Sequence, residues 1–108
     1  MNVTTDTFER DVIERSRELP VVVDFWAAWC GPCRMLAPAL EAEIAKRAGS
    51  FELAKVDVDA EQQVAARYGI QSLPTVVVFR DGEPVTGFVG AHPAAAIARF
   101  LDEVPVAA

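Results

Sequence analysis

The sequence predicts an α/β protein, a three-layer α/β/α sandwich with a central mixed sheet of four to five strands and four flanking helices. Three observations lead to this prediction. Apolar β-branched runs alternate with segments of helical periodicity, the run Val21–Trp26 is apolar enough to be buried on both faces, and Asp81-Gly82 is a hairpin signal. Helix-connected parallel strands that are followed by a hairpin imply a mixed sheet with helices on both faces.

The first elements are a helix and a buried strand. Phe8, Val12 and Ile13 recur at helical spacing, so a helix is expected around them. Pro20 then precedes Val21–Trp26, a run typical of a strand in the middle of a parallel sheet.

The next segment has the pattern of a long helix. Leu36, Leu40 and Ile44 share one helical stripe, and Gly49 is a suitable residue to end the helix. Pro38 lies inside it and is expected to kink it, because proline lacks the backbone donor and crowds the preceding turn.

The second half of the chain alternates strands and helices and then ends with a hairpin and a helix. The expected elements are a strand at residues 51–58, a short helix at 59–68, strands at 75–79 and 84–89, and a helix that begins at Pro93. The fifth strand of the upper count would be a short edge strand at the extreme N-terminus.

Length and charge restrict the class of protein. The 108 residues are expected to form a single domain, 1–108, and the formal net charge of -6 argues against nucleic acid or anionic lipid as a partner. No apolar run approaches the ~20 residues of a membrane helix, and the N-terminus lacks the pattern of a secretory signal. A cytoplasmic monomer is therefore expected.

The two cysteines, Cys30 and Cys33, are only three positions apart. A structural disulfide stabilises a protein most when it closes a long loop, which this pair does not do. A zinc site usually needs four nitrogen or sulfur ligands, and the sequence offers only His92 besides the two cysteines. Two thiols this close together are suited to making and breaking a disulfide reversibly. Redox chemistry is thus favoured over a staple, a metal site or two unrelated buried cysteines.

The position of the cysteines suggests a division of roles. Cys30 falls where the buried strand gives way to a helix, and the N-terminus of a helix favours the negative charge of a thiolate. Cys33 lies one turn further in and is expected to be less exposed. We therefore expect Cys30 to attack a substrate disulfide and Cys33 to resolve the mixed disulfide.

Asp24 is unusual because aspartate is disfavoured in strands and costly to bury. It either reaches solvent at the edge of the sheet, or it is a desolvated carboxyl of raised pKa that exchanges a proton with Cys33. Lys55, on a neighbouring strand, either tempers that shift or is a plain surface lysine.

Two further residues have two interpretations each. Pro74 follows Leu73 just before a strand, and base rates favour a trans bond whereas a cis bond would present backbone groups beside the thiols. Trp29, like Trp26, is a core residue by default, although its place next to Cys30 also suits exposure and substrate contact.

Taken together, these motifs resemble the thioredoxin family. The resemblance covers residues 8–101, and segments in this order are far more specific than two cysteines alone. The matching segments are Val23-Asp24-Phe25-Trp26-Ala27, Trp29-Cys30-Gly31-Pro32-Cys33, Pro38, Lys55-Val56-Asp57-Val58-Asp59, Tyr68-Gly69-Ile70, Leu73-Pro74-Thr75, Gly82 and Val89-Gly90-Ala91. Ala28 and Ser72 depart from the family pattern, which commonly has a polar residue and a glycine there.

The resemblance implies a protein-disulfide reductase with the family's thioredoxin fold. It implies that Cys30 is the nucleophile, Cys33 the resolving cysteine, and Asp24 a buried proton acceptor and donor paired with Lys55. It also implies that Pro74 is a cis-proline, whose preceding residue binds the substrate backbone as an antiparallel strand would.

The same resemblance implies an apolar docking surface and a source of electrons. No bound cofactor and no metal are expected, because NADPH reduces the protein through a thioredoxin reductase; the other partners are oxidised proteins. The residues that match the family's docking surface are Trp29, Gly31, Pro32, Val58, Leu73, Val89, Gly90 and Ala91.

Two other functions remain open at this point. A thioredoxin-like chaperone or binding module would use the apolar surface and have only incidental redox activity. An oxidase or isomerase of an oxidising compartment is disfavoured by the Gly31-Pro32 pair, which the resemblance associates with reducing members, and by the lack of a signal peptide.

Overall fold

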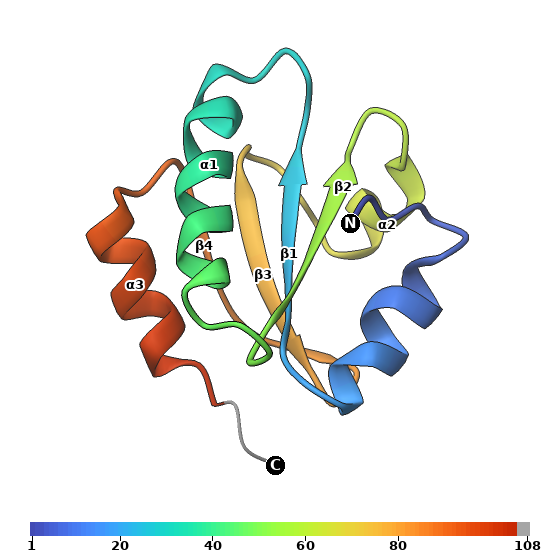
Figure 1. The fold of residues 1–108 in the computed structure, drawn as a ribbon. Helices are drawn as coiled ribbons and strands as arrows, with labels where there is room; N and C mark the ends of the chain where they lie inside the picture. The colour runs from blue at the N-terminus through green and yellow to red at the C-terminus, as the bar shows by residue number, and fades with distance from the viewer. Residues whose placement is uncertain (106–108) are drawn as a thin grey trace.

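The computed structural model describes residues 1–105 and contains a four-stranded mixed sheet in the order β2-β1-β3-β4 (Figure 1). Four strands agree with the predicted four to five. At the extreme N-terminus, where a fifth strand was expected, there is only an isolated bridge between Asn2 and Lys55. The strands are β1 (Val21–Trp26), β2 (Glu52–Asp57), β3 (Thr75–Arg80) and β4 (Glu83–Val89).

The central strand is β1, which explains its composition. It pairs with β2 in parallel and with β3 on its other edge, and Val21 to Phe25 are all buried. A strand with neighbours on both edges and helices on both faces has no position that favours a polar residue. The bounds of β1 agree with the prediction from sequence.

The direction of β3 differs from the expectation for helix-connected strands. β3 is antiparallel to β1, with Thr75 opposite Phe25 and Val21 opposite Phe79. The short helix α2 (Gln62–Arg67) explains this direction. Its six residues rise only ~9 Å, whereas a strand of six residues spans ~20 Å, so α2 is too short to carry the chain back along the sheet. The chain therefore enters β3 at the end of the sheet where β2 finished, instead of returning to the other end.

Helical segments cover both faces of the sheet, so the predicted three layers are confirmed. α1 (Gly31–Ala45) and α3 (Ala94–Glu103) lie on one face, whereas α2 and the N-terminal helical segment lie on the other (Figure 1). The N-terminal segment is a π-helix, η1 (Glu9–Glu14), followed by a 3₁₀ turn, η2 (Arg15–Arg17). α1 continues through Pro38 without interruption.

Alternation along β1 divides the core into two clusters. Val21, Val23 and Phe25 pack with the N-terminal helical segment and α2, and Val22 packs with α1 and α3. The largest fully buried side chains that the helical segments add to the core are Phe8 and Val12 on one face of the sheet. On the other face they are Leu36, Leu40, Ile97 and Leu101.

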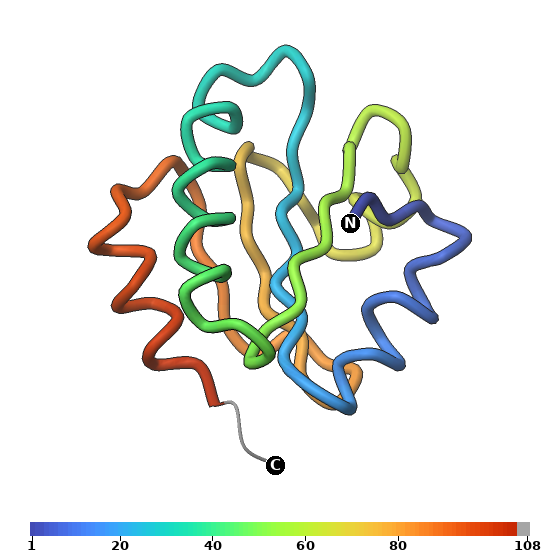
Figure 2. Tube along the Cα trace, in the orientation of Figure 1, coloured from blue at the N-terminus to red at the C-terminus, as the bar shows by residue number. Residues whose placement is uncertain are grey.

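One end of the sheet is left for the redox motif. β1 and β2 both finish at this end, and the chain between β1 and α1 loops out beyond it (Figure 2). β3 begins there, and β4 finishes there because Val89 is opposite Thr75. At the other end, Asp81 and Gly82 both have positive φ (54° and 82°), as a tight hairpin turn requires. No helix within residues 1–105 is both long and apolar enough to cross a membrane.

Candidate active site

The two cysteines lie at the junction between the central strand and α1. After β1 ends at Trp26, the N–H of Cys30 donates to the carbonyl of Ala27 at 3.1 Å, and α1 begins at the next residue. Cys30 and Cys33 form a disulfide with a Cα–Cα distance of 5.3 Å. The redox pair expected from the spacing is therefore placed to form its bond within one turn of helix.

Cys30 is the N-cap residue of α1, and its sulfur has a specific partner. The backbone N–H of Cys33 donates to Cys30 Sγ at 3.2 Å, as a capping side chain accepts from the first turn. This N–H and the helix dipole both favour negative charge on that sulfur. Both residues are buried, and Cys33 is the less exposed, as expected, at 2% against 4% for Cys30.

Asp24 is buried in the centre of the sheet, so the interpretation as a solvated edge residue is wrong. It is 1% exposed, and its Oδ1 atom has no hydrogen-bond partner among residues 1–105. Burial raises the pKa of Asp24 to about 6, while Lys55 acts to lower that pKa and Glu41 to raise it. A carboxyl of this kind can take up or release a proton near neutral pH.

A small cavity connects this carboxyl with the disulfide. Its volume is about 110 Å³, and both Asp24 and Cys33 line it. A water molecule occupies about 30 Å³ in the liquid, so the space between the two groups is large enough for water. The remaining lining residues are Trp26, Arg34, Ala37 and Lys55.

Lys55 is the register partner of Asp24 on β2. Its Nζ atom lies 3.9 Å from Glu41 Oε2 and 5.8 Å from the centroid of the Trp26 ring. The side chain is 27% exposed, so it is neither fully buried nor a free surface lysine. It reaches the cavity and also contacts an acidic residue on α1.

The Leu73-Pro74 bond is cis, as the family resemblance implies and against the base rate for proline. Leu73 packs against the cluster formed by Ala27, Cys30 and Cys33. Pro74 is buried, and its carbonyl accepts a hydrogen bond of 2.9 Å from the N–H of Gly90. The segment before β3 and the segment after β4 are thereby joined next to the disulfide.

The residues expected to form a docking surface lie at the same end of the sheet. Trp29 is 69% exposed, which contradicts the default placement in the core, and its indole N–H donates to Asp59 Oδ2 at 2.9 Å. Val89 is 56% exposed, and Gly90 has a φ of 96°, which only glycine adopts freely. Pro32 and Ala91 are exposed, and Gly31, Val58, Leu73 and Gly90 are half-buried.

Three residues of this region have contacts that the sequence did not predict. Arg34 lines the cavity and donates to the carbonyl of Ala28 at 2.6 Å, Glu41 contacts Lys55, and Asp59 binds Trp29. Helical spacing offered a signal for two of them, because Arg34, Ala37 and Glu41 are separated by three and four positions and so share one face of α1.

The last residue considered as a possible metal ligand is His92, which lies outside the cavity beside the disulfide. His92 is exposed, and its ring packs edge-on against Phe88 with centroids 4.8 Å apart. Within residues 1–105, no group of three or more His, Cys, Asp or Glu side chains is arranged to hold a metal ion.

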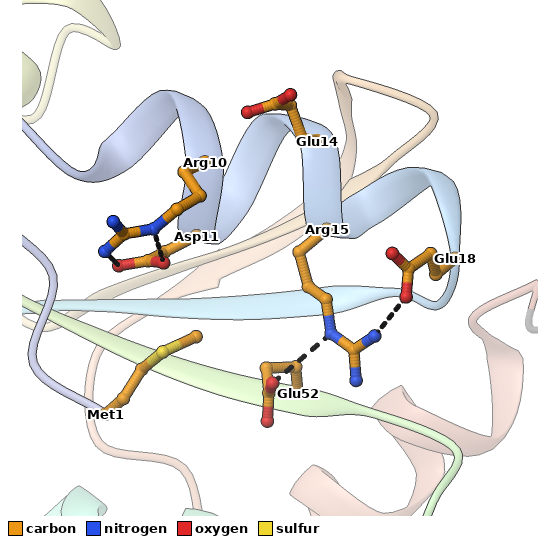
Figure 3. A pocket seen from close by; sticks show the side chains of 7 residues that line it. All are labelled: Met1, Arg10, Asp11, Glu14, Arg15, Glu18 and Glu52. Atoms are coloured by element: carbon orange, nitrogen blue, oxygen red, sulfur yellow. Dashed lines mark hydrogen bonds and ion pairs between the residues drawn. The ribbon is translucent and has the colours of Figure 1, made fainter.

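A wider pocket of about 390 Å³ lies at the other end of the sheet, between the N-terminal helical segment and the start of β2 (Figure 3). Its two arginines already form ion pairs with neighbouring acids. Arg10 pairs with Asp11 at 2.9 Å, and Arg15 with Glu18 and Glu52. This pocket shares no lining residue with the cavity beside the disulfide.

A disulfide at a strand-to-helix junction, with a buried carboxyl behind it, defines the class of thiol–disulfide oxidoreductases. The thioredoxin family model matches residues 1–103. The chain is 52% identical over 98 residues to a thioredoxin of Streptomyces clavuligerus, which covers 91% of this chain and 89% of that protein.

Other curated relatives agree with this match. Identity is 47% over 103 residues with a thioredoxin of Mycolicibacterium smegmatis, covering 94% and 90% of the two chains. It is 45% over 101 residues with thioredoxin 1 of Synechococcus elongatus, covering 94% and 92%. The chain therefore belongs to the thioredoxin family and is a dithiol–disulfide oxidoreductase that acts as a redox carrier. Members of this family carry no bound cofactor; NADPH supplies their electrons through a thioredoxin reductase.

Proposed function

We propose that this chain is a general protein-disulfide reductase in which Cys30 is the nucleophile and Cys33 the resolving cysteine. The observation that carries the assignment is the N-cap position of Cys30, whose sulfur accepts the N–H of Cys33 at 3.2 Å. In the reduced protein the same donor and the helix dipole stabilise a thiolate on Cys30, which is the form that attacks disulfides.

The reaction proceeds through two exchanges of sulfur. The Cys30 thiolate attacks one sulfur of the substrate disulfide, the substrate S–S bond breaks, and the other substrate sulfur leaves as a thiolate that takes a proton from solvent. Cys33 then attacks Cys30 Sγ in the mixed disulfide. The second substrate thiolate leaves, and the Cys30–Cys33 disulfide remains, so two electrons have passed to the substrate.

The second exchange requires that Cys33 lose its proton. Asp24 is assigned as the acceptor because it shares the 110 Å³ cavity with Cys33 and has a pKa raised to about 6 by burial. Lys55 is assigned to temper that rise, which its position opposite Asp24 in the sheet supports. When the disulfide is reduced again, Asp24 returns a proton to Cys33.

Substrates are proposed to dock on the apolar surface around the disulfide. Trp29 and Val89 are exposed at this end of the sheet, and Leu73, which precedes Pro74, packs against the cysteines. An extended substrate segment would pair with the backbone of Leu73 in antiparallel fashion. The surface comprises Trp29, Gly31, Pro32, Val58, Leu73, Val89, Gly90 and Ala91.

The wider setting is proposed from the family and from the charge. We assign a thioredoxin reductase as the electron donor, oxidised proteins as substrates, and a cytoplasmic monomer of one domain as the working form. The net charge of -6 speaks against nucleic acid and anionic membranes as partners.

The test is the reduction of insulin disulfides by the wild-type protein, with NADPH and a bacterial thioredoxin reductase or with dithiothreitol alone. Activity in both reactions is expected, and Cys30→Ser should reduce it to the uncatalysed rate. Cys33→Ser should instead accumulate mixed disulfides with substrate. Full activity of Cys30→Ser, or failure of Cys33→Ser to trap any substrate, would overturn the assigned roles.

A second candidate function is a binding module or chaperone that uses the apolar surface alone. It is favoured by one observation, the 69% exposure of Trp29. The variant with both cysteines replaced by serine separates the two functions. This variant should lose all disulfide reduction, and a binding module would still suppress aggregation of an unfolded protein at full strength.

A further inference from the structure

Lys55 lies between two carboxylates of very different exposure. Asp24, its register partner on β1, is 1% exposed, and Glu41 on α1 has a side chain that is 54% exposed. The Lys55 Nζ atom is 3.9 Å from Glu41 Oε2. Among residues 1–105, Glu41 is the only acid within ion-pair distance of this ammonium group.

The surroundings of Asp24 leave Lys55 as the cation that could pair with it. Lys55 faces the cavity from β2, and Arg34 and Cys33 face it from α1, with Glu41 two turns beyond Arg34 on that helix. The guanidinium of Arg34 is directed to the carbonyl of Ala28, at 2.6 Å. A lysine side chain has a flexible stem, so its ammonium group can move between two acceptors.

We propose that Glu41 is a positioning residue for Lys55: it attracts the ammonium group toward the surface, and so prevents a direct ion pair between Lys55 and Asp24. This inference rests on the proposed role of Asp24 as proton acceptor for Cys33. A direct pair would stabilise the carboxylate and make it a weaker base.

The chemical consequence concerns the second exchange of the reaction. As Cys33 attacks Cys30 Sγ and the substrate thiolate leaves, the proton of the Cys33 thiol passes to a carboxylate oxygen of Asp24. A carboxylate held by an ammonium group accepts that proton less readily. Glu41 thus keeps Asp24 basic enough for the transfer, although Glu41 contacts neither the sulfur atoms nor the substrate.

The test follows the titration of the Asp24 carboxyl by NMR in the oxidised protein. The variants are Glu41→Gln, Lys55→Gln and the combination of both. Glu103→Gln on α3 is the matched control, because it removes one exposed negative charge from a different helix. Glu41→Gln is expected to lower the pKa of Asp24 by roughly half a unit to one unit, and Lys55→Gln to raise it. Glu103→Gln should leave it unchanged.

The double variant decides whether Glu41 acts through Lys55. In the Lys55→Gln background the effect of Glu41→Gln should shrink to less than half, since the group to be positioned is gone. An equal shift in both backgrounds would mean that Glu41 acts on Asp24 by its own charge, and would overturn the proposal. The absence of any shift in Glu41→Gln would overturn it as well.

A kinetic measurement separates this inference from the proposed function. The pH profile of insulin reduction should move to lower pH in Glu41→Gln and should lose its Asp24-dependent part in Asp24→Asn. If Asp24→Asn leaves the profile unchanged, the proposed role of Asp24 fails. If Asp24→Asn changes the profile but Glu41→Gln does not, only the positioning role of Glu41 fails.

Discussion

Two buried carboxylates of this protein have opposite surroundings. Asp24 is 1% exposed at the cavity behind the disulfide, and Glu43 is 5% exposed near the C-terminal end of α1. Asp24 Oδ1 has no partner among residues 1–105, whereas Glu43 accepts from Lys46 Nζ at 2.7 Å and from Arg47 at 3.3 Å. Burial raises the pKa of Asp24, but the hydrogen bond from Lys46 lowers the pKa of Glu43.

The difference shows that the supply of partners, and not depth alone, decides what a buried acid does. Around Glu43, Arg47 also binds Asp102 at 2.8 Å and the carbonyl of Ala98 at 3.2 Å, so α1 and α3 are joined by one connected network. A carboxylate in such a network stays ionised and contributes to stability. Around Asp24 the network is incomplete, which costs stability and leaves a group that can exchange protons.

The largest effect is expected from Asp24→Asn on the pH dependence of stability. The folded protein holds the Asp24 proton up to about pH 6, whereas the unfolded chain releases it near the ordinary value of 3.8. The folded state therefore binds more protons between these two values, and its stability falls as pH rises through them. The variant should remove this loss of about 3 kcal/mol.

Urea unfolding of the oxidised protein and the variant at about pH 3.5 and pH 7.5 measures this effect. From the lower to the higher pH, the stability of the variant relative to the wild type should rise by about 3 kcal/mol. Since the cost of burying the Asn amide is the same at both values, it cancels in the comparison. The same difference at both pH values would show that Asp24 is not the acid described here.

The contrast between the two acids also indicates how much was predictable. β1 is predicted to the residue because an apolar run is a local signal, and the placement of Cys30 at the start of a helix follows from the same boundary. The direction of β3 depends on how far α2 carries the chain, which is a property of three-dimensional geometry and not of local pattern.

The environment of individual polar groups is harder to predict than the elements that carry them. Asp24 could be a solvated edge residue or a buried acid until the order of the strands placed β1 in the centre. The roles of Glu41 and Asp59 arise from contacts with Lys55 and Trp29 on other elements, so helical spacing can place Glu41 on one face of α1 with Arg34 but does not show its partner. The cis bond before Pro74 was implied by the family and not by the residues themselves.

A smaller effect is expected from Arg47→Met, which damages the complete network without touching the redox centre. Arg47 donates to the carbonyls of Glu43 and Ala98 as well as to Asp102, and its side chain is 20% exposed. Loss of these bonds should lower the free energy of unfolding by about 2 kcal/mol. Insulin reduction at 25 °C should be unchanged, and Arg99→Met on the exposed side of α3 serves as the control. A loss of activity in folded Arg47→Met would contradict the separation between the two acids.

The smallest effect, and the one that tests the comparison most directly, is expected from Glu43→Gln. The pKa of Glu43 is lowered in the folded protein, mainly by the hydrogen bond from Lys46. The folded state thus binds fewer protons than the unfolded chain near the ordinary value of 4.5, so the contribution of Glu43 to stability is present above that pH and is lost as pH falls.

Glu43→Gln should lower stability at neutral pH, by less than Arg47→Met because the arginine keeps its bonds to Ala98 and Asp102. In the same urea experiment, the stability of Glu43→Gln relative to the wild type should rise as the pH falls. The relative stability of Asp24→Asn should instead fall as the pH falls. If the stability of both variants relative to the wild type changed with pH in the same direction, depth alone would govern buried acids in this fold, and the distinction between the two sites would fail.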